Sequence, residues 1–370
     1  MTRVVILGGG FAGLAAARQL RKLRGRAEVI LVDRRPSSDF LPLVGDLLYR
    51  RIDPRLLQSD LASLAGPLGF RFLNTEATGI DLAGKSLSTS AGPLHWDYLI
   101  LAAGAEPNFY GTEALRAQTF PLASVADAGR IVSALERDGY AAVLVVGGSY
   151  TGVEAATGLR RRLGPDGLPV LIAEQAPTLV PERDAWVRDY VETNCRAMGV
   201  EVLCGTTLTG VRGRDAALSN GRVVKNALVL WAAGVAAGPV VRRLDVEKDA
   251  QGRLVVDEFL RLNDSVFVAG DSACVMHKGK AVRMAIQPAL DQGRTAGANV
   301  RALIEGRPLR RYRPVDLGWI VPMANSRSCG KALGVPVRGF AATALHYLMC
   351  LWRTPGLARR ARILRRLLAR

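Results

Sequence analysis

The chain has 370 residues, of which 49% are hydrophobic and 22% charged, and its formal net charge is +17. This composition is typical of a globular protein of two or three domains and excludes a disordered or fibrous chain. No apolar run reaches the roughly 20 residues that span a bilayer. The first expected strand begins near residue 3 and leaves no room for a signal peptide, so we expect the protein to face the cytoplasm.

The first expected elements form a dinucleotide-binding fingerprint. An apolar run at residues 4–7 precedes a Gly-Gly-Gly-Phe-Ala-Gly turn at 8–13 and an Ala- and Leu-rich stretch. Gly8 permits the tight turn, Gly10 the approach of a pyrophosphate, and Gly13 close packing of helix on strand. Asp33 ends the next apolar run, where its carboxylate can accept hydrogen bonds from an adenosine ribose.

The segments that follow continue the first lobe. We expect helical structure at residues 56–65, strands at 70–73 and 86–89, and a buried strand from 94 that ends in small residues at Ala103 and Gly104. Small residues in this place let a loop press against a cofactor.

A second fingerprint begins in mid-chain. The apolar run at 142–146 precedes a Gly-Gly-Ser-Tyr-Thr-Gly turn at 147–152, and Glu174 follows the next apolar run. Ser149 replaces the middle glycine and is small enough for a close approach. A helix is expected near 183–198. Two fingerprints predict two bound dinucleotides, and hence hydride transfer between a flavin and a nicotinamide.

The second lobe ends in an apolar run that starts at residue 227, and the pattern after residue 234 indicates that the chain returns to the first lobe. An apolar run ending in Ala-Ala-Gly at 232–234 repeats the pattern around Gly104, and a Val-Ala-Gly-Asp stretch at 268–271 follows. Asp271 can bind the ribityl and phosphate side of a flavin. We predict an α/β fold with two Rossmann-like domains, the NAD(H)-binding domain being inserted into the FAD-binding domain. The expected boundaries are 1–111 and 235–308 for FAD, 112–234 for NAD(H), and 309–370 for a basic C-terminal region.

The C-terminal region concentrates the positive charge. Residues 306–370 contain 14 Lys or Arg and a single acid, and so carry +13 of the net +17. After an apolar stretch at 339–352 and a Thr-Pro-Gly break, residues 357–370 have the pattern of a basic amphipathic helix. Its apolar face holds Leu357, Ala361, Leu364 and Leu368.

Such a helix can lie in the interface of an anionic membrane, and the competing interpretation is a helix packed on the protein's own body. It has few interleaved aromatic residues, which argues against nucleic acid as a partner. The five cysteines form no closely spaced pair, and we therefore expect neither a metal site nor a disulfide framework.

The order of these motifs resembles that of the two-dinucleotide-binding-domain flavoproteins, most closely the type II NADH dehydrogenases (NADH:quinone oxidoreductases). Besides the two fingerprints, the resemblance rests on Phe-Leu-Pro-Leu at 40–43, Gly-Val-Glu at 152–154, Trp-Ala-Ala-Gly-Val at 231–235 and Val-Ala-Gly-Asp at 268–271. It covers most of the chain and fades from residue 313.

This resemblance implies FAD and NADH as cofactors and assigns residues to their sites. The cofactor-binding residues it implies are Gly8, Gly10, Phe11, Ala12, Gly13, Asp33, Arg34, Pro42, Ala77, Ala103, Gly104, Gly147, Ser149, Gly152, Glu174, Ala233, Gly234, Gly270, Asp271 and Gln287. Glu174 would repel a 2′-phosphate, so NADH is expected rather than NADPH.

Two further residues match family positions with a catalytic role. Glu154 matches a glutamate near the meeting point of nicotinamide and flavin; its alternative role is a charge at a helix N-terminus. Gln287 matches the first glutamine of a family stretch beside the quinone; its alternative role is that of a polar residue at a helix start. Asp291 replaces the second family glutamine and Ile286 the family alanine, which puts the identity of the quinone in doubt.

The implied function is hydride transfer from NADH to FAD and reduction of a membrane quinone without proton pumping. The enzyme would be a peripheral protein on the cytoplasmic face of the cell membrane, bound to anionic lipid through its basic helix. Sulfide:quinone reduction is an alternative, but it requires two redox cysteines, and none precedes Tyr190.

Two more functions compete with quinone reduction. One is that of an NAD(P)H-dependent reductase of a ferredoxin-like protein, and the second is that of a non-enzymatic flavoprotein whose tail binds nucleic acid. The sequence leaves open whether two copies pair into a homodimer, and what residues 319–331 do.

Overall fold

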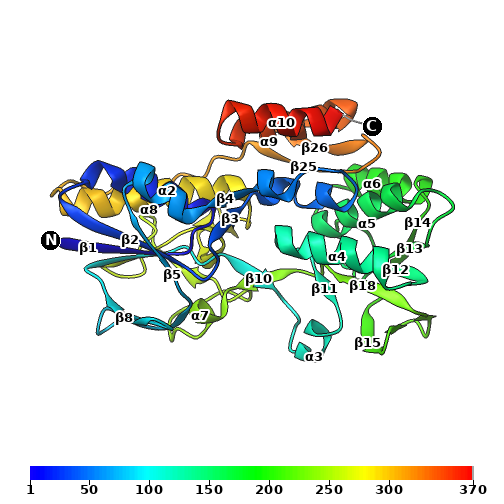
Figure 1. The fold of residues 1–370 in the computed structure, drawn as a ribbon, viewed down its shortest axis with the longest axis horizontal. Helices are drawn as coiled ribbons and strands as arrows, with labels where there is room; N and C mark the ends of the chain where they lie inside the picture. Colours follow the sequence, from blue (N-terminus) through cyan, green and yellow to red (C-terminus); the bar gives the residue numbers. More distant parts are fainter. Residues whose placement is uncertain (369–370) are drawn as a thin grey trace. The chain divides into compact units, whose positions relative to one another are not determined.

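Two parallel five-stranded sheets form the framework of the computed structural model, which describes residues 1–368 (Figure 1). Each sheet belongs to its own compact unit. Unit 1 contains Met1–Asp39, Ser59–Glu106 and Val235–Asp316, and unit 2 contains Phe40–Gln58, Pro107–Gly234 and the chain from Leu317 onward. The predicted α/β class with parallel sheets is therefore confirmed.

The sheet of unit 1 has the order β21-β9-β1-β2-β5, with every pair parallel. Its strands are β1 (Thr2–Leu7), β2 (Ala27–Asp33), β5 (Arg71–Asn74), β9 (Tyr98–Leu101) and β21 (Val266–Val268). Val4, Val5 and Ile6 in its central strand are fully buried, as expected where both faces of a sheet are covered.

Helices α1 (Phe11–Leu20) and α8 (Ile286–Ile304) pack closely on each other in unit 1. Glycines on α8 allow this: a Cβ at Gly293 would lie 2.1 Å from the carbonyl oxygen of Ala12, and one at Gly297 would lie 2.6 Å from that of Ala16. The middle of α8 is thereby held against the first turns of α1.

Shorter elements complete unit 1 and its borders. They are β3 (Ser37–Asp39), β4 (Gln58–Asp60), α2 (Leu61–Leu68), β6 (Ala77–Asp81), β7 (Ser86–Thr89), β8 (Gly92–His95), β10 (Ala105–Pro107), β19 (Val235–Ala237), α7 (Pro239–Arg242), β20 (Leu254–Val255), β22 (Ala273–Cys274), β23 (Met276–His277) and β24 (Lys280–Ala281), with 3₁₀ turns η1 (Arg21–Leu23) and η5 (Gly270–Ser272).

The sheet of unit 2 repeats the plan in the order β11-β18-β12-β13-β14, again all parallel. Its strands are β11 (Phe120–Pro121), β12 (Ala142–Val146), β13 (Val170–Glu174), β14 (Val200–Cys204) and β18 (Ala227–Trp231). Helices α3 (Glu113–Arg116), α4 (Val125–Arg137), α5 (Tyr150–Leu163) and α6 (Ala185–Ala197) belong to this unit. So do the strands β15 (Leu208–Arg212), β16 (Asp215–Leu218) and β17 (Val223–Val224), and the 3₁₀ turns η2 (Leu41–Leu43), η3 (Gly45–Leu48) and η4 (Pro54–Leu57).

The C-terminal segment adds a small sheet and two helices to unit 2. Strands β25 (Gly318–Val321), β26 (Ser328–Ala332) and β27 (Val335–Gly339) are antiparallel, and α9 (Phe340–Arg353) and α10 (Leu357–Leu368) follow. The unassigned segment 319–331 thus provides two strands of this sheet.

Two expected elements differ from the structure. The stretch 56–65 is a 3₁₀ turn, a short strand and the start of α2, because the side chain of Asp60 accepts a 2.6 Å hydrogen bond from the backbone N–H of Ser63 and begins the helix only at Leu61. The strand expected from residue 94 is two strands, β8 and β9. Asp97 lies between them, and its side chain leaves the strand pattern to accept a 2.6 Å hydrogen bond from the N–H of Arg3.

Candidate active site

The first glycine turn joins β1 to α1 without a side-chain cap. Gly8 has a φ of 110°, and a Cβ there would lie 2.1 Å from the carbonyl oxygen of Ala102. Gly10 is the N-cap and no side chain caps the helix, so the first turn presents backbone N–H groups, at Ala12 and Gly13, to an anion. A Cβ on Gly10 would meet nothing within 4 Å. This open, uncapped turn fits the pyrophosphate of a dinucleotide.

Asp33 holds the same turn in place from the end of β2. Its carboxylate accepts hydrogen bonds from the N–H of Gly9 at 2.7 Å and from that of Arg35 at 2.8 Å. The neighbouring Arg34 is paired with Glu106 at 2.6 Å. The acid therefore lies beside the turn, as its predicted ribose-binding role requires.

The carboxyl ends of β9 and β21 supply the next group of predicted residues. Gly104 has a φ of 72° and open space around it, and it follows Ala103 directly after β9. Desolvation raises the pKa of Asp271 to about 6, although Arg253 opposes the rise. The adjacent Ser272 hydroxyl is buried without a hydrogen-bond partner among the described residues. An orphaned hydroxyl beside an acid suits the polar ribityl chain of a flavin.

Gln292 is a residue that sequence reasoning missed. It is buried, and its side-chain oxygen accepts a 2.7 Å hydrogen bond from the N–H of Gly270. It fixes the Gly-Asp turn to α8. Its position next to Asp291 in the family stretch was the only signal in the sequence that could have identified it.

Gln287 lies in the first turn of α8, bonded within its own helix. Its amide nitrogen donates to Asp291 at 2.7 Å, and Asp291 also pairs with Arg294 at 2.9 Å. The substitution of the second family glutamine by Asp291 therefore gives Gln287 a charged partner.

Two other predicted cofactor residues lie in different units. Ala77 lies in β6 of unit 1, while Pro42 lies in η2 of unit 2.

The second glycine turn is built in the same way between β12 and α5. A Cβ at Gly152 would lie 1.8 Å from the carbonyl oxygen of Gly147. In the first turn, a Cβ at Gly13 would lie at the same distance from the carbonyl oxygen of Gly8. The N-cap Ser149 makes no capping hydrogen bond; its hydroxyl contacts Glu182 at 3.3 Å. This turn also leaves helix N–H groups for a phosphate.

Glu174 plays the part that Asp33 plays in unit 1. Its carboxylate accepts from the N–H of Gly148 at 2.5 Å and from that of Ala176 at 2.8 Å. Gly234 has a φ of 127°, and the Tyr110 hydroxyl donates to the carbonyl of Ala233 at 2.9 Å. The predicted NADH residues are thus brought together in unit 2.

Glu154 extends from the second turn of α5 toward η3. A Cβ added at Gly45 would lie 2.4 Å from Cδ of Glu154, so any larger residue there would displace this carboxyl. Desolvation raises the pKa of Glu154 well above its ordinary value, and the negative charge of Asp46 raises it further. The protonated form is favoured, which suits a group that holds a proton.

Asp46 lies at the centre of a buried polar cluster, which the sequence did not reveal. Its Oδ1 accepts from the hydroxyls of Tyr49 at 2.9 Å and Tyr347 at 2.8 Å, and from Nε of Arg50 at 2.9 Å. Arg50 also donates to the carbonyl of Leu367 at 2.8 Å. The cluster therefore ties η3, beside Glu154, to both C-terminal helices.

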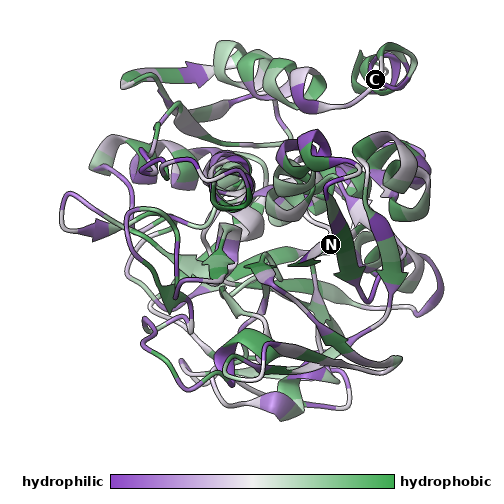
Figure 2. Ribbon diagram, turned by 90° about the vertical axis from the view of Figure 1, so that its left-hand side faces the viewer, coloured by the Kyte–Doolittle hydropathy of each residue, from purple (hydrophilic) through white to green (hydrophobic). Residues whose placement is uncertain are grey.

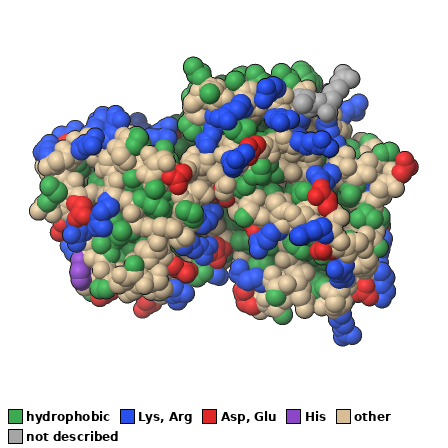
Figure 3. All heavy atoms as spheres, in the orientation of Figure 1, with side chains coloured by type: hydrophobic (Ala, Val, Ile, Leu, Met, Phe, Trp, Pro, Cys, Tyr) green, Lys and Arg blue, Asp and Glu red, His purple; other side chains and the backbone are tan. Residues whose placement is uncertain are grey.

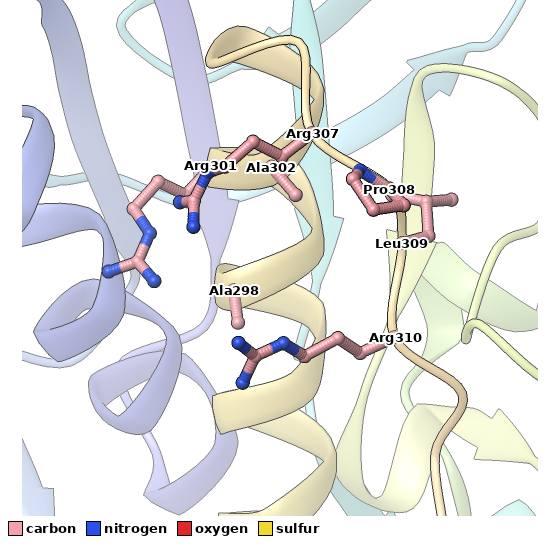
Figure 4. A pocket seen from close by; sticks show the side chains of 7 residues that line it. All are labelled: Ala298, Arg301, Ala302, Arg307, Pro308, Leu309 and Arg310. Atoms are coloured by element: carbon pink, nitrogen blue, oxygen red, sulfur yellow. The ribbon is translucent and has the colours of Figure 1, made fainter.

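A basic cavity of about 190 Å³ lies at the opposite end of α8 from Gln287. Arg301, Arg307 and Arg310 line it, and their side chains come from the last turns of α8 and the segment after it (Figure 4). A 19-residue helix is about 28 Å long, so this cavity is separate from the flavin residues. Among residues 1–368, no group of acids, histidines and cysteines could hold a metal ion.

Comparison with known proteins agrees with this geometry. The family model described as pyridine nucleotide-disulphide oxidoreductase matches residues 2–293. A Mycobacterium tuberculosis protein named NADH dehydrogenase-like protein is 30% identical over 355 residues, which cover 89% of this chain and 87% of the relative. A type II NADH:quinone oxidoreductase of Haemophilus influenzae is 26% identical over 385 residues, with coverage of 89% and 87%.

The solved structures include NDH2 from Plasmodium falciparum in complex with NADH. It has a TM-score of 0.87 and 15% identity, and the alignment covers 99% of this chain and 97% of that chain. This similarity shows a common fold, and the relatives confirm the resemblance drawn from the motifs. The chain belongs to the pyridine nucleotide-disulphide oxidoreductase family.

Proposed function

We propose that the protein is an FAD-dependent NADH:quinone oxidoreductase. The observation that carries this proposal is the repeated turn, uncapped at its helix and held by an acid, once in each unit. The names of the relatives support it, since several are type II NADH:quinone oxidoreductases. In this proposal unit 1 holds FAD and unit 2 holds NADH.

The two glycine turns and the acids beside them then have binding tasks. Bound FAD would supply the chemistry, by accepting hydride from NADH and passing two electrons to a quinone. The turn at Gly10 and the acid Asp33 would hold the FAD phosphate and ribose, and Asp271 the ribityl chain. The turn at Ser149 and the acid Glu174 would hold NADH.

Glu154 and Gln287 would act on the reaction itself. A quinone that accepts hydride still needs one proton, and the carboxyl of Glu154 favours its protonated form. We propose that it holds this proton and that Gln287, anchored by Asp291, orients the quinone through its amide.

Burial raises the pKa of the Cys329 thiol to about 12, which disfavours the thiolate that sulfide chemistry would require.

The C-terminal helices support a peripheral membrane location. The face of α10 predicted to be apolar, with Leu357, Ala361, Leu364 and Leu368, is exposed, and Ile363 on the opposite side is buried. Exposed residues along α9 are also apolar, at Ala341, Ala344, Leu348 and Trp352. Basic side chains flank hydrophobic ones over α10 (Figure 3). Within residues 1–368, no helix combines the length and the hydropathy of a bilayer crossing.

We therefore propose that α9 and α10 lie in the surface of an anionic membrane. The cytoplasmic leaflet carries the anionic lipids, so the basic helix favours the cytoplasmic face. The quinone, which is dissolved in lipid, would reach the enzyme there. A homodimer held by the same helices is the competing use of this surface.

Anaerobic stopped-flow absorbance of the flavin tests the function. NADH should bleach the flavin, and a short-chain quinone should restore its colour at a rate that accounts for turnover. Bleaching without reoxidation would contradict quinone reduction and favour a protein acceptor. Failure of NADH to bleach the flavin would contradict the NADH half of the proposal.

A further inference from the structure

The hairpin between β26 and β27 has an unusual residue in its turn. Ala332 pairs with Val335, so Leu333 and Gly334 alone form the turn, with φ values of 49° and 84°. Positive φ at both central residues is the pattern of a type I′ turn, in which Asn or Asp usually precedes Gly. Leucine is costly there, because its side chain crowds the backbone in the left-handed region.

The same leucine is also exposed. The accessible fraction of Leu333 is 74%, and that of Val335 on the other side of the turn is 63%. An exposed leucine gains no burial from folding, so the folded chain offers no compensation for its strained backbone. A residue that breaks a local rule without a gain in the folded state indicates a role outside the fold.

The surroundings of the turn identify the partner. The hairpin, α9 and α10 lie side by side along one edge of unit 2, at the top of Figure 2. All three present exposed apolar residues. Basic residues are exposed on the same elements, at Arg338 on β27 and at Arg362 and Arg365 on α10. Exposed apolar and basic groups on the same elements match a bilayer with anionic headgroups.

We propose that the turn at Leu333 inserts into the surface of an anionic bilayer, as a third membrane contact beside α9 and α10. The inference rests on the proposed membrane location and adds a segment that the amphipathic helices do not include. Insertion should be shallow, because the polar backbone groups of the turn must remain hydrated. Leu333 would then reach the upper acyl region. Lipid would bury its side chain there, whereas the free protein leaves it exposed.

The substitution Leu333→Asn separates this role from a structural one, because the two predict opposite effects. Asn is favoured in the turn, so the melting temperature should stay the same or rise. The apparent dissociation constant for phosphatidylcholine vesicles containing phosphatidylglycerol should become about tenfold weaker, since one buried leucine is lost. Vesicle sedimentation of the flavin-loaded full chain measures this constant.

Two further variants complete the experiment. Leu333→Trp should retain binding, and its added emission should be quenched by brominated acyl chains. Val223→Thr changes an exposed apolar residue on β17, outside the hairpin and both helices, and should leave vesicle binding unchanged.

Several outcomes would overturn the inference. Binding of Leu333→Asn equal to that of the wild type would do so, as would a lowered melting temperature accompanied by weaker binding. So would a change from dimer to monomer with unaltered vesicle affinity, because the tip would then contact a second copy of the chain. If the wild type itself does not bind vesicles, the proposed membrane location fails as well, and stopped-flow reoxidation by quinone tests the proposed reaction separately.

Discussion

Glu154 and Asp46 show how a single side chain acquires its chemistry from its neighbours. The glutamate lies on a helix whose sequence gives no sign of burial, yet η3 covers it and brings a second carboxylate close. Three donors bind Oδ1 of that second carboxylate, on Asp46. The raised pKa of Glu154 is therefore a product of the packing around it.

A first prediction concerns pH and Glu154. Its folded-state pKa is raised above its unfolded value, so the folded protein binds more protons, and wild-type stability must fall as pH rises between these two values. Glu154→Gln removes this loss. The melting temperature of the variant relative to the wild type should therefore increase from about pH 5 to pH 8. Scanning calorimetry at several pH values measures it.

The control for this experiment is Glu113→Gln, which changes an exposed glutamate of the same unit. Its melting temperature relative to the wild type should show little dependence on pH. A Glu154→Gln curve parallel to the wild-type curve at every pH would refute the desolvated carboxyl.

A second prediction concerns the choice of nicotinamide. In Glu174→Gln one oxygen remains to accept from the N–H of Gly148 or Ala176, but the negative charge that would oppose a 2′-phosphate is gone. The ratio of kcat/KM for NADPH to that for NADH should rise roughly tenfold. Steady-state kinetics with both nucleotides measures the ratio. An unchanged ratio would show that Glu174 does not face the ribose.

Strand, turn and helix act together at the element scale. Each fingerprint is a buried parallel strand that ends in a glycine turn, where the next helix begins without a side-chain cap. The glycines within one turn have different tasks. Gly13 lies against the carbonyl of Gly8, whereas Gly10 faces open space.

Two alanine substitutions distinguish these tasks. Gly13→Ala would place a Cβ 1.8 Å from the carbonyl oxygen of Gly8, and we expect it to lower the free energy of unfolding by about 1–3 kcal/mol or more. Gly10→Ala meets no neighbour and has an ordinary φ of −77°, so stability should hold while flavin content falls. Thermal denaturation and the flavin-to-protein absorbance ratio measure the pair. Equal effects on both quantities in the two variants would contradict separate roles.

The whole molecule carries its positive charge and its exposed apolar residues in the C-terminal segment. Converting Leu357, Leu364 and Leu368 to Ser removes the apolar stripe of α10 but leaves Ile363 and the arginines in place. Vesicle binding should weaken by at least tenfold while flavin absorbance and quinone kinetics with a short-chain quinone remain unchanged. Undiminished binding of this triple variant would show that α10 does not contact the lipid.

Deletion of residues 357–370 gives the stronger form of the same test. It removes six arginines as well, so the truncated protein should lose vesicle binding. Vesicle binding by the wild type should weaken as salt is added. The point substitutions are the better measurement, because deletion also removes the buried Ile363 and the carbonyl that Arg50 binds.

The sequence by itself determined the repeated fingerprint, the α/β class and the family, because glycine turns, buried strands and terminal acids depend on local geometry that nearby residues impose. It also identified the apolar face of α10, since helical spacing alone defines that face, whereas only the structure shows that this face is exposed. Tertiary structure decided the rest. Residues 40–58 and the C-terminal helices contribute to one unit although about 300 residues separate them. The Asp46 cluster, the desolvation of Glu154 and the apolar residues near the Leu333 hairpin therefore had no local signal. Burial and charge coupling depend on which distant segments meet, and only the folded chain defines these contacts.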